Sequence, residues 1–213
     1  KSTHQKFVAD LVARRAPRVI QTREPGGTEL AERLREAILG QPMAPEVETL
    51  LLFAARADHV ARVIRPALEA GTWVVCDRFS DATYAYQGAG KGVPRDLIER
   101  LSAAAHPGLA PDRTLVFDCS YEVSRARLSN SGKPLDRFES EDRAFFERVR
   151  AAYLERARAE PARVRVIDAS QADVAVIIPP ELTASLFERD GQAAVLVYHD
   201  PTLTLGPGIV RDV

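Results

Sequence analysis

The stretch TWVVCDRF (residues 72–79) joins a continuous apolar run to an aspartate and an arginine. A short apolar run that ends at a polar residue is typical of a β-strand buried on both faces of a sheet. The pattern recurs at TLVFD (114–118) and at VRVI (164–167), and RVIQT (18–22) predicts a further short strand. These four stretches predict the strands of one sheet.

Helical patterns fill the intervals between the strands. Apolar residues recur there every three or four positions, and Thr28 and Gly40 can begin and end one of the helices. The expected helices cover residues 7–15, 28–40, 45–70, 94–105, 121–128 and 139–159. Strands that alternate with helices predict the α/β class, with a parallel sheet flanked by helices. Ligands of such sheets bind beyond the carboxyl ends of the strands, which is where CDRF (76–79) and the turn REPGG (23–27) are expected.

Composition narrows the function classes. A chain of 213 residues with 46% hydrophobic and 28% charged content suffices for one globular domain. The net charge of −1 gives no basic field for nucleic acid. Neither a signal peptide nor an apolar segment of about 18 residues occurs, so we expect a cytoplasmic protein without a membrane partner. Cys76 and Cys119 are expected to be buried, reduced thiols, and the four histidines lack the spacing of a zinc site.

The chain begins with KST (1–3), directly before a helical pattern. Lysine followed by serine or threonine ends the phosphate-binding loop G-x-x-x-x-G-K-[ST], whose lysine reaches the phosphates and whose hydroxyl holds Mg²⁺. The tripeptide alone is unspecific, but four longer motifs follow it in order. They are TREPGGTELAERLREAIL (22–39), LLLFAARADHV (50–60), VVCDRFSDATYAYQG (74–88) and LDRFESED (135–142).

Together these motifs resemble those of bacterial thymidylate kinase, from Lys1 to about Ser170. The resemblance implies a P-loop nucleoside-monophosphate-kinase fold with strand order 2-3-1-4-5. It also implies Mg²⁺- and ATP-dependent phosphorylation of dTMP to dTDP for dTTP synthesis, usually by a homodimer.

The resemblance assigns one group of residues to dTMP. Arg78 would clamp its phosphate, because a planar guanidinium matches two phosphate oxygens. Phe53 would stack on thymine, and Arg56 would bond to its O4 from the same helix edge. Tyr86 would pack on the deoxyribose and disfavour a 2′-OH, and Gln87 would bind the thymine edge. The complete set expected at dTMP is Glu24, Arg35, Phe53, Arg56, Arg78, Thr83, Tyr86 and Gln87.

A second group is assigned to ATP, Mg²⁺ and catalysis. Ser2 and Asp77 would hold Mg²⁺, partly through water. The segment 124–142 resembles a mobile lid, in which Arg137 is the strongest catalytic candidate. Its part SNSGKP (129–134) departs from the family pattern, so which lid cation touches the transferred phosphate stays open. The expected catalytic residues are Lys1, Asp77, Arg78 and Arg137, and those expected at ATP are Lys1, Ser2, Thr3, Arg125 and Lys133.

The two ends of the chain lead to separate expectations. Lys1 would be the end of a phosphate loop whose glycines, together with the central first strand, precede this chain, so we expect poor stability and poor activity. Residues 1–171 are expected to form the kinase domain and 172–213 an unrelated or divergent tail that resembles a segment of ABC-2-type permeases. Either VAVII (174–178) or AAVLVY (193–198) could fill the central gap in the sheet.

Alternatives remain at the level of single residues and of function. Asp77 and Arg78 could form a strand-end salt bridge, Arg35 could be an exposed helix arginine, and Phe53 could be a core residue. The alternative functions are a deoxynucleoside kinase and a non-catalytic fragment fused to a permease-derived segment.

Overall fold

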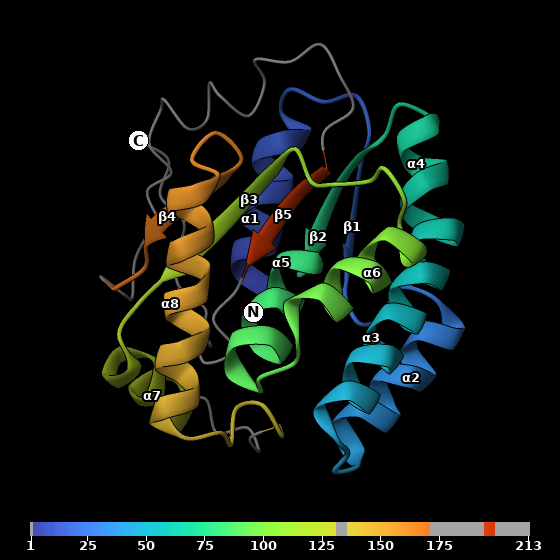
Figure 1. Cartoon of the computed structure of the whole chain (residues 1–213). Helices are drawn as coiled ribbons and strands as arrows, with labels where there is room; N and C mark the ends of the chain where they lie inside the picture. Colours follow the sequence, from blue (N-terminus) through green and yellow to red (C-terminus); the bar gives the residue numbers. More distant parts are fainter. Residues whose placement is uncertain (1, 131–135, 171–193, 199–213) are drawn as a thin grey trace.

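The computed structural model describes residues 2–130, 136–170 and 194–198. These residues form a parallel sheet with helices on both faces (Figure 1). The strands are β1 (Val19–Arg23), β2 (Trp73–Asp77), β3 (Arg113–Asp118), β4 (Val164–Asp168) and β5 (Ala194–Tyr198). The predicted α/β class and parallel sheet are therefore confirmed, and the four predicted strands lie within one residue of their expected bounds.

Strand β5 occupies the centre of the sheet, whose order is β1-β2-β5-β3-β4. It pairs in parallel with β2 on one side and with β3 on the other (Figure 1). This confirms the prediction for residues 194–198 of AAVLVY (193–198), which fill the central position, whereas VAVII (174–178) lies outside the described residues. The central strand of the kinase-like sheet thus comes from the part of the chain that was expected to be a tail. The proposed domain boundary at residue 171 itself stays a prediction.

One face of the sheet is covered by α1 (Ser2–Ala13). Val8 and Val12 of this helix are fully buried against Leu115 and Phe117 of β3. The helix begins earlier than the expected residue 7. Gln5 fastens it, because its side-chain amide donates to the carbonyl of Thr22 at 2.5 Å.

The opposite face is covered mainly by α8 (Arg143–Ala159). Val149 and Tyr153 of α8 pack on Val116 and Val164 of the strands. The predicted helix over 139–159 is wrong in its first turn, because the Asp142 side chain caps the helix by accepting from the Phe145 N–H at 2.7 Å. Three further helices are α2 (Glu29–Gly40), α6 (Arg95–Ala105) and α7 (Tyr121–Asn130).

The predicted helix over 45–70 is continuous but not uniform. It consists of α3 (Pro45–His59), the π-helical turn η1 (Val60–Ile64) and α4 (Arg65–Glu69). Pro66 lacks an N–H and its ring crowds the carbonyl one turn earlier, which is a common cause of such an irregular turn. The irregular turn still contributes to the core, because Val60 and Ile64 pack against Val74 and Cys76 of β2.

Sequence periodicity assigned no helix to residues 80–90, although the structure has two there. They are the short α5 (Ser80–Thr83) and the π-helical η2 (Tyr84–Gly90). Two glycines and two tyrosines weaken the helical pattern of this segment. Its helical form depends on tertiary packing, because Tyr86 and Ala85 are buried against α8.

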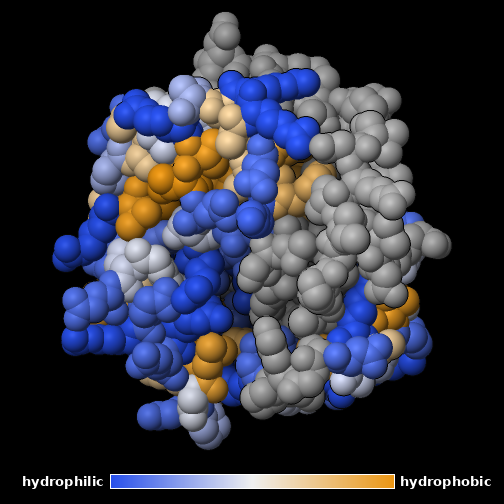
Figure 2. Space-filling model, turned by 180° about the vertical axis from the view of Figure 1, so that it is seen from behind, coloured by the Kyte–Doolittle hydropathy of each residue, from blue (hydrophilic) through white to orange (hydrophobic). Residues whose placement is uncertain are grey.

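Seen from behind, the described surface is mainly hydrophilic, with one larger hydrophobic patch at the upper left (Figure 2). Among the described residues, no helix is both long and apolar enough to cross a bilayer. Cys76 and Cys119 are buried, as predicted, and form no disulfide in the described part of the chain.

The central position of β5 predicts a large effect of a proline at Val195, which pairs with Val75 and Arg113. Proline removes a ladder hydrogen bond from a central strand, and we expect Val195→Pro to lower the free energy of unfolding by about 2 kcal/mol or more. Val195→Ile keeps the N–H and serves as the control. Urea unfolding measures both variants. An unchanged midpoint in Val195→Pro would show that residues 194–198 are not part of the sheet.

Candidate active site

The predicted ligand-binding edge forms where β1 and β2 end. Arg23 and Asp77 are partners in the β-ladder, and the next backbone N–H, that of Glu24, donates to the Asp77 carbonyl at 2.9 Å. The turn 23–27 and the segment 76–79 therefore lie side by side, as the sequence predicts. Gly27 is required in this turn, because its φ is +87° and a Cβ would lie 2.5 Å from the ring of His59.

Glu24 is the centre of a buried polar network. Its Oε2 accepts from Arg56 Nε at 2.6 Å, and its Oε1 accepts from His59 Nδ1 at 3.0 Å. His59 Nε2 lies 2.6 Å from the Thr22 hydroxyl, and Arg56 Nη2 donates to the Thr83 hydroxyl at 3.1 Å. Glu24 and Arg56 are only 3% and 2% exposed, so the loss of either partner would leave a buried charge.

A pocket of about 440 Å³ opens beside this network. It brings together six of the eight residues predicted to bind dTMP, namely Glu24, Arg56, Arg78, Thr83, Tyr86 and Gln87. Leu52, Ala82 and Phe138 give the pocket an apolar wall. Among the described residues, the Nη1 atom of Arg56 is buried without a hydrogen-bond partner. The pocket thus combines cations, an amide and apolar surface, as a nucleotide requires.

Two arginines make one end of the site suitable for an anion. Arg78 has a φ of +71°, a backbone conformation that non-glycine residues adopt at a cost and that clusters at functional sites. Burial lowers the pKa of Arg35, and the nearby charges of Arg78 and Arg23 lower it further. A bound phosphate would relieve this repulsion between neighbouring cations.

Two of the predicted dTMP residues do not line the pocket. Phe53 is buried in a core cluster with Val93 and Ile98, and the Arg56 guanidinium lies 4.7 Å from its ring centroid. Arg35 donates to the carbonyl of Pro25 at 3.0 Å and so supports the turn 23–27. The predicted stacking of Phe53 on thymine and the predicted binding of phosphate by Arg35 remain predictions.

The expected ATP side is described only in part. Ser2 begins α1 and Thr3 follows it, while Lys1 and Lys133 lie outside the described residues. Asp77 ends β2, and its Oδ1 is buried without a hydrogen-bond partner among the described residues. A buried carboxylate oxygen without a donor is suited to a cation or its water shell.

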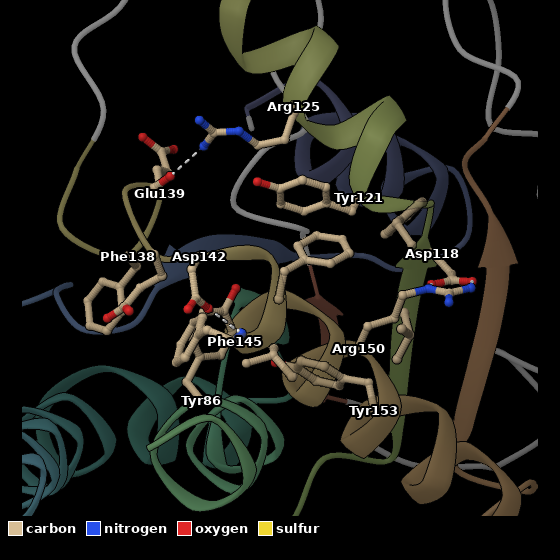
Figure 3. A pocket seen from close by; sticks show the side chains of 15 residues that line it. Tyr86, Asp118, Tyr121, Arg125, Phe138, Glu139, Asp142, Phe145, Arg150 and Tyr153 are labelled. Carbon is tan, nitrogen blue, oxygen red and sulfur yellow. Dashed lines mark hydrogen bonds and ion pairs between the residues drawn. The ribbon is translucent and has the colours of Figure 1, made fainter.

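A second pocket of about 540 Å³ lies between α7 and α8 (Figure 3). Tyr86 and Phe138 line both pockets and separate them; their rings meet edge to face with centroids 5.9 Å apart. Arg125, a predicted ATP ligand, lines this second pocket and donates to the Glu139 carbonyl at 3.0 Å (Figure 3).

Arg137 directly precedes Phe138, which lines both pockets. Its guanidinium forms an ion pair with Glu48 of α3, which is fully buried. Lys91 and Gln87 contact the same carboxylate. A direct role of Arg137 at the transferred phosphate stays a prediction.

Asp81 supports helix α5, which lines the pocket, through hydrogen bonds to its buried carboxylate. Its Oδ1 accepts from Arg156 Nε at 2.6 Å, and its Oδ2 accepts from Arg163 Nη1 and the Thr114 hydroxyl, both at 2.8 Å. Because Ala82 and Thr83 follow Asp81 directly, this network holds the pocket-lining helix α5 against β3 and α8.

Sequence reasoning missed His59, Asp81, Glu48 and Phe138 as parts of the site. His59 and Asp81 occur within the recognised motifs LLLFAARADHV (50–60) and VVCDRFSDATYAYQG (74–88), so their position beside predicted residues was an available signal. Glu48 lies outside all of these motifs, and nothing in the sequence indicates that its side chain is buried.

A parallel α/β sheet with a pocket that contains arginines beside its carboxyl edge is typical of α/β proteins that bind phosphorylated ligands. The protein-family model described as thymidylate kinase matches residues 1–177 of the chain. The chain is 50% identical to the thymidylate kinase of Bordetella pertussis over 194 residues. This alignment covers 91% of this chain and 92% of the relative. It is 53% identical over 174 residues to that of Pseudomonas syringae, at 80% and 82% coverage, respectively.

Its fold is similar to that of the crystal structure of thymidylate kinase from Ehrlichia chaffeensis, with a TM-score of 0.63 and 31% identity over 79% of this chain and 83% of that one. The chain therefore belongs to the thymidylate kinase family.

The Asp81 network predicts acid sensitivity. Burial alone would raise the pKa of Asp81, but hydrogen bonds from Arg163 and the charge of Arg156 outweigh it and hold the pKa below its ordinary value. Asp81 therefore stabilises the fold above the ordinary aspartate pKa of about 4, and this contribution is lost as the pH falls through the lowered value.

We expect Asp81→Asn to lose about 3 kcal/mol of stability at pH 7 and to lose less than the wild type on acidification. Asp96→Asn is the control, because Asp96 forms an exposed pair with Arg100. Urea unfolding from pH 7 to pH 3 tests this prediction, and parallel stability curves for wild type and Asp81→Asn would contradict it.

Proposed function

We propose that this chain transfers the terminal phosphoryl group of ATP to dTMP, giving dTDP and ADP. The observation that carries the proposal is the 440 Å³ pocket, in which Arg78 at one position and Arg56 with Gln87 at another can hold the two polar ends of a nucleoside monophosphate. Membership of the thymidylate kinase family supports the same substrate pair.

Phosphoryl transfer requires aligned oxygens and compensation of negative charge more than covalent participation of the protein. In the proposal Arg78 binds two oxygens of the acceptor phosphate through its planar guanidinium, and Arg35 adds a second positive charge nearby. The buried pair of Glu24 with Arg56 keeps the Arg56 guanidinium in place, so that its remaining N–H groups are oriented before the nucleotide binds.

The residues present fit a magnesium ion. Asp77 offers a buried carboxylate oxygen at the end of β2. The described residues contain no group of three or more His, Cys, Asp or Glu side chains that could hold a metal, which suits an ion bound mainly by phosphates and water. When bound, Mg²⁺ would neutralise charge on the phosphate oxygens of ATP.

The primary test measures ADP release with ATP, Mg²⁺ and either dTMP or thymidine. We expect release with dTMP and none above background with thymidine, because the cations at Arg78 and Arg35 need an anionic acceptor. Release with thymidine alone would assign the chain to the deoxynucleoside kinases. Calorimetric binding of dTMP without release of ADP would favour the non-catalytic alternative.

Arg78→Lys tests the role of the guanidinium. Lysine keeps the charge but cannot bind two phosphate oxygens in parallel, so we expect kcat/KM for dTMP to fall about 100-fold or more. Arg95→Lys on the exposed face of α6 is the matched control and should match the wild type. Equal kcat/KM values for Arg78→Lys and the wild type would rule out the clamp.

We further propose that the enzyme is a cytoplasmic homodimer. The two neighbouring helices α2 and α3 expose three large apolar side chains, Leu30, Val47 and Leu50, each about half exposed. Large apolar side chains exposed on two neighbouring helices favour association with a like surface.

The dimer predicts that Leu50→Glu shifts the mass in light scattering from that of a dimer to that of a monomer. The same charge is introduced as a control by Val166→Glu, on β4 at the far side of the sheet, and should leave the mass unchanged. A wild type that runs as a monomer at micromolar concentration would end the proposal.

A further inference from the structure

Glu48 is a buried carboxylate without a role in the reaction described so far. It lies in the first turns of α3, is 0% exposed, and accepts from three donors. Gln87 Nε2 lies 2.7 Å from its Oε1, and Lys91 Nζ lies 2.8 Å from its Oε2, which Arg137 also contacts. Two cations thus compensate the charge, and the carboxylate acts only as an acceptor.

This contact decides which end of the Gln87 amide faces which way. The oxygen and nitrogen of a side-chain amide are nearly equal in shape, so only hydrogen bonding distinguishes the two orientations. A carboxylate cannot donate, and therefore the NH₂ group of Gln87 must lie toward Glu48. The carbonyl oxygen and the second N–H of the amide are then the groups that Gln87 offers to a ligand in the pocket it lines.

Arg56 supplies the complementary group from the same pocket. Its Nε and Nη2 bind Glu24 and Thr83, whereas its buried Nη1 has no hydrogen-bond partner among the described residues. The pocket therefore presents a fixed acceptor from Gln87 and a fixed donor from Arg56. A base that carries a ring N–H beside a carbonyl oxygen, as thymine does, matches both of these groups. Cytosine carries a ring nitrogen acceptor beside an amino group and matches neither, so that only the second N–H of the Gln87 amide is left for it.

We propose that Glu48 is a positioning residue that sets base specificity by orienting the Gln87 amide, and so favours bases with a ring N–H over cytosine. The proposal rests on the proposed function. It extends to residues 136–139, because Arg137 binds the same carboxylate and Phe138 borders the pocket. Glu48 joins the base-binding amide and this segment in one network.

The test compares dTMP with dCMP as acceptors in the wild type and in Glu48→Gln. A glutamine at position 48 can donate as well as accept, so the Gln87 amide is no longer held in one orientation. We expect the ratio of kcat/KM for dTMP to that for dCMP to fall at least about tenfold, while the KM for ATP stays unchanged. This ratio does not depend on the fraction of folded enzyme, so partial loss of stability cannot produce the effect.

Glu46→Gln is the matched control, because Glu46 is an exposed glutamate on the same helix and should leave the ratio unchanged. A second arm places Glu48→Gln in a Gln87→Ala background, where no further change in the ratio is expected, since the amide through which Glu48 acts is gone. An unchanged ratio in the single variant, or an equal loss in both backgrounds, would overturn the proposal.

Calorimetry separates this proposal from the proposed function. The dissociation constants of dTMP and dCMP can be compared without turnover, and their ratio should fall in Glu48→Gln as the kinetic ratio does. A wild type that prefers dTMP in binding but releases no ADP would refute the kinase function and leave the role of Glu48 standing. A wild type without preference between the two nucleotides would refute the role of Glu48.

Discussion

Parallel pairing sets Arg23 of β1 opposite Asp77 of β2, so the chain leaves both strands at the same level of the sheet. The hydrogen bond from the Glu24 N–H to the Asp77 carbonyl continues this pairing by one residue beyond the strands. Arg78 then turns away with a left-handed backbone, and Glu24 turns inward to meet Arg56. The pocket follows from this arrangement, because Glu24 and Arg78 come from two loops that the β-ladder holds together and Arg56 reaches them from α3.

A buried ion pair stabilises a fold only weakly, because desolvation offsets much of the attraction. The pair of Glu24 with Arg56 is therefore better explained by the orientation it imposes than by stability. His59, whose other ring nitrogen is hydrogen-bonded to Thr22, holds the second oxygen of Glu24, so the carboxylate cannot rotate and the guanidinium has one position. The same reasoning applies to Asp81, which orders α5 through three hydrogen-bond donors from β3, α8 and Arg163.

The fold was largely predictable from local patterns. Apolar runs such as the one at 72–76 identify buried strands, and the order of the motifs led to six residues that line one pocket. The helical form of residues 80–90 was not predictable, because it depends on packing of Tyr86 against α8 rather than on periodicity. Glu48 shows the same limit for the site, since a glutamate in the first turns of a helix normally faces solvent.

The central place of β5 has a consequence for the order of folding. During synthesis residues 2–170 leave the ribosome before residues 194–198, and until then β2 and β3 each present an unpaired edge at the middle of the sheet. The contacts that join β5 to β2 span more than a hundred residues, which gives this sheet a high contact order and a slow final step. From the completion of β3 until residues 194–198 follow, a nascent chain of this protein thus carries β2 and β3 without the strand that joins them.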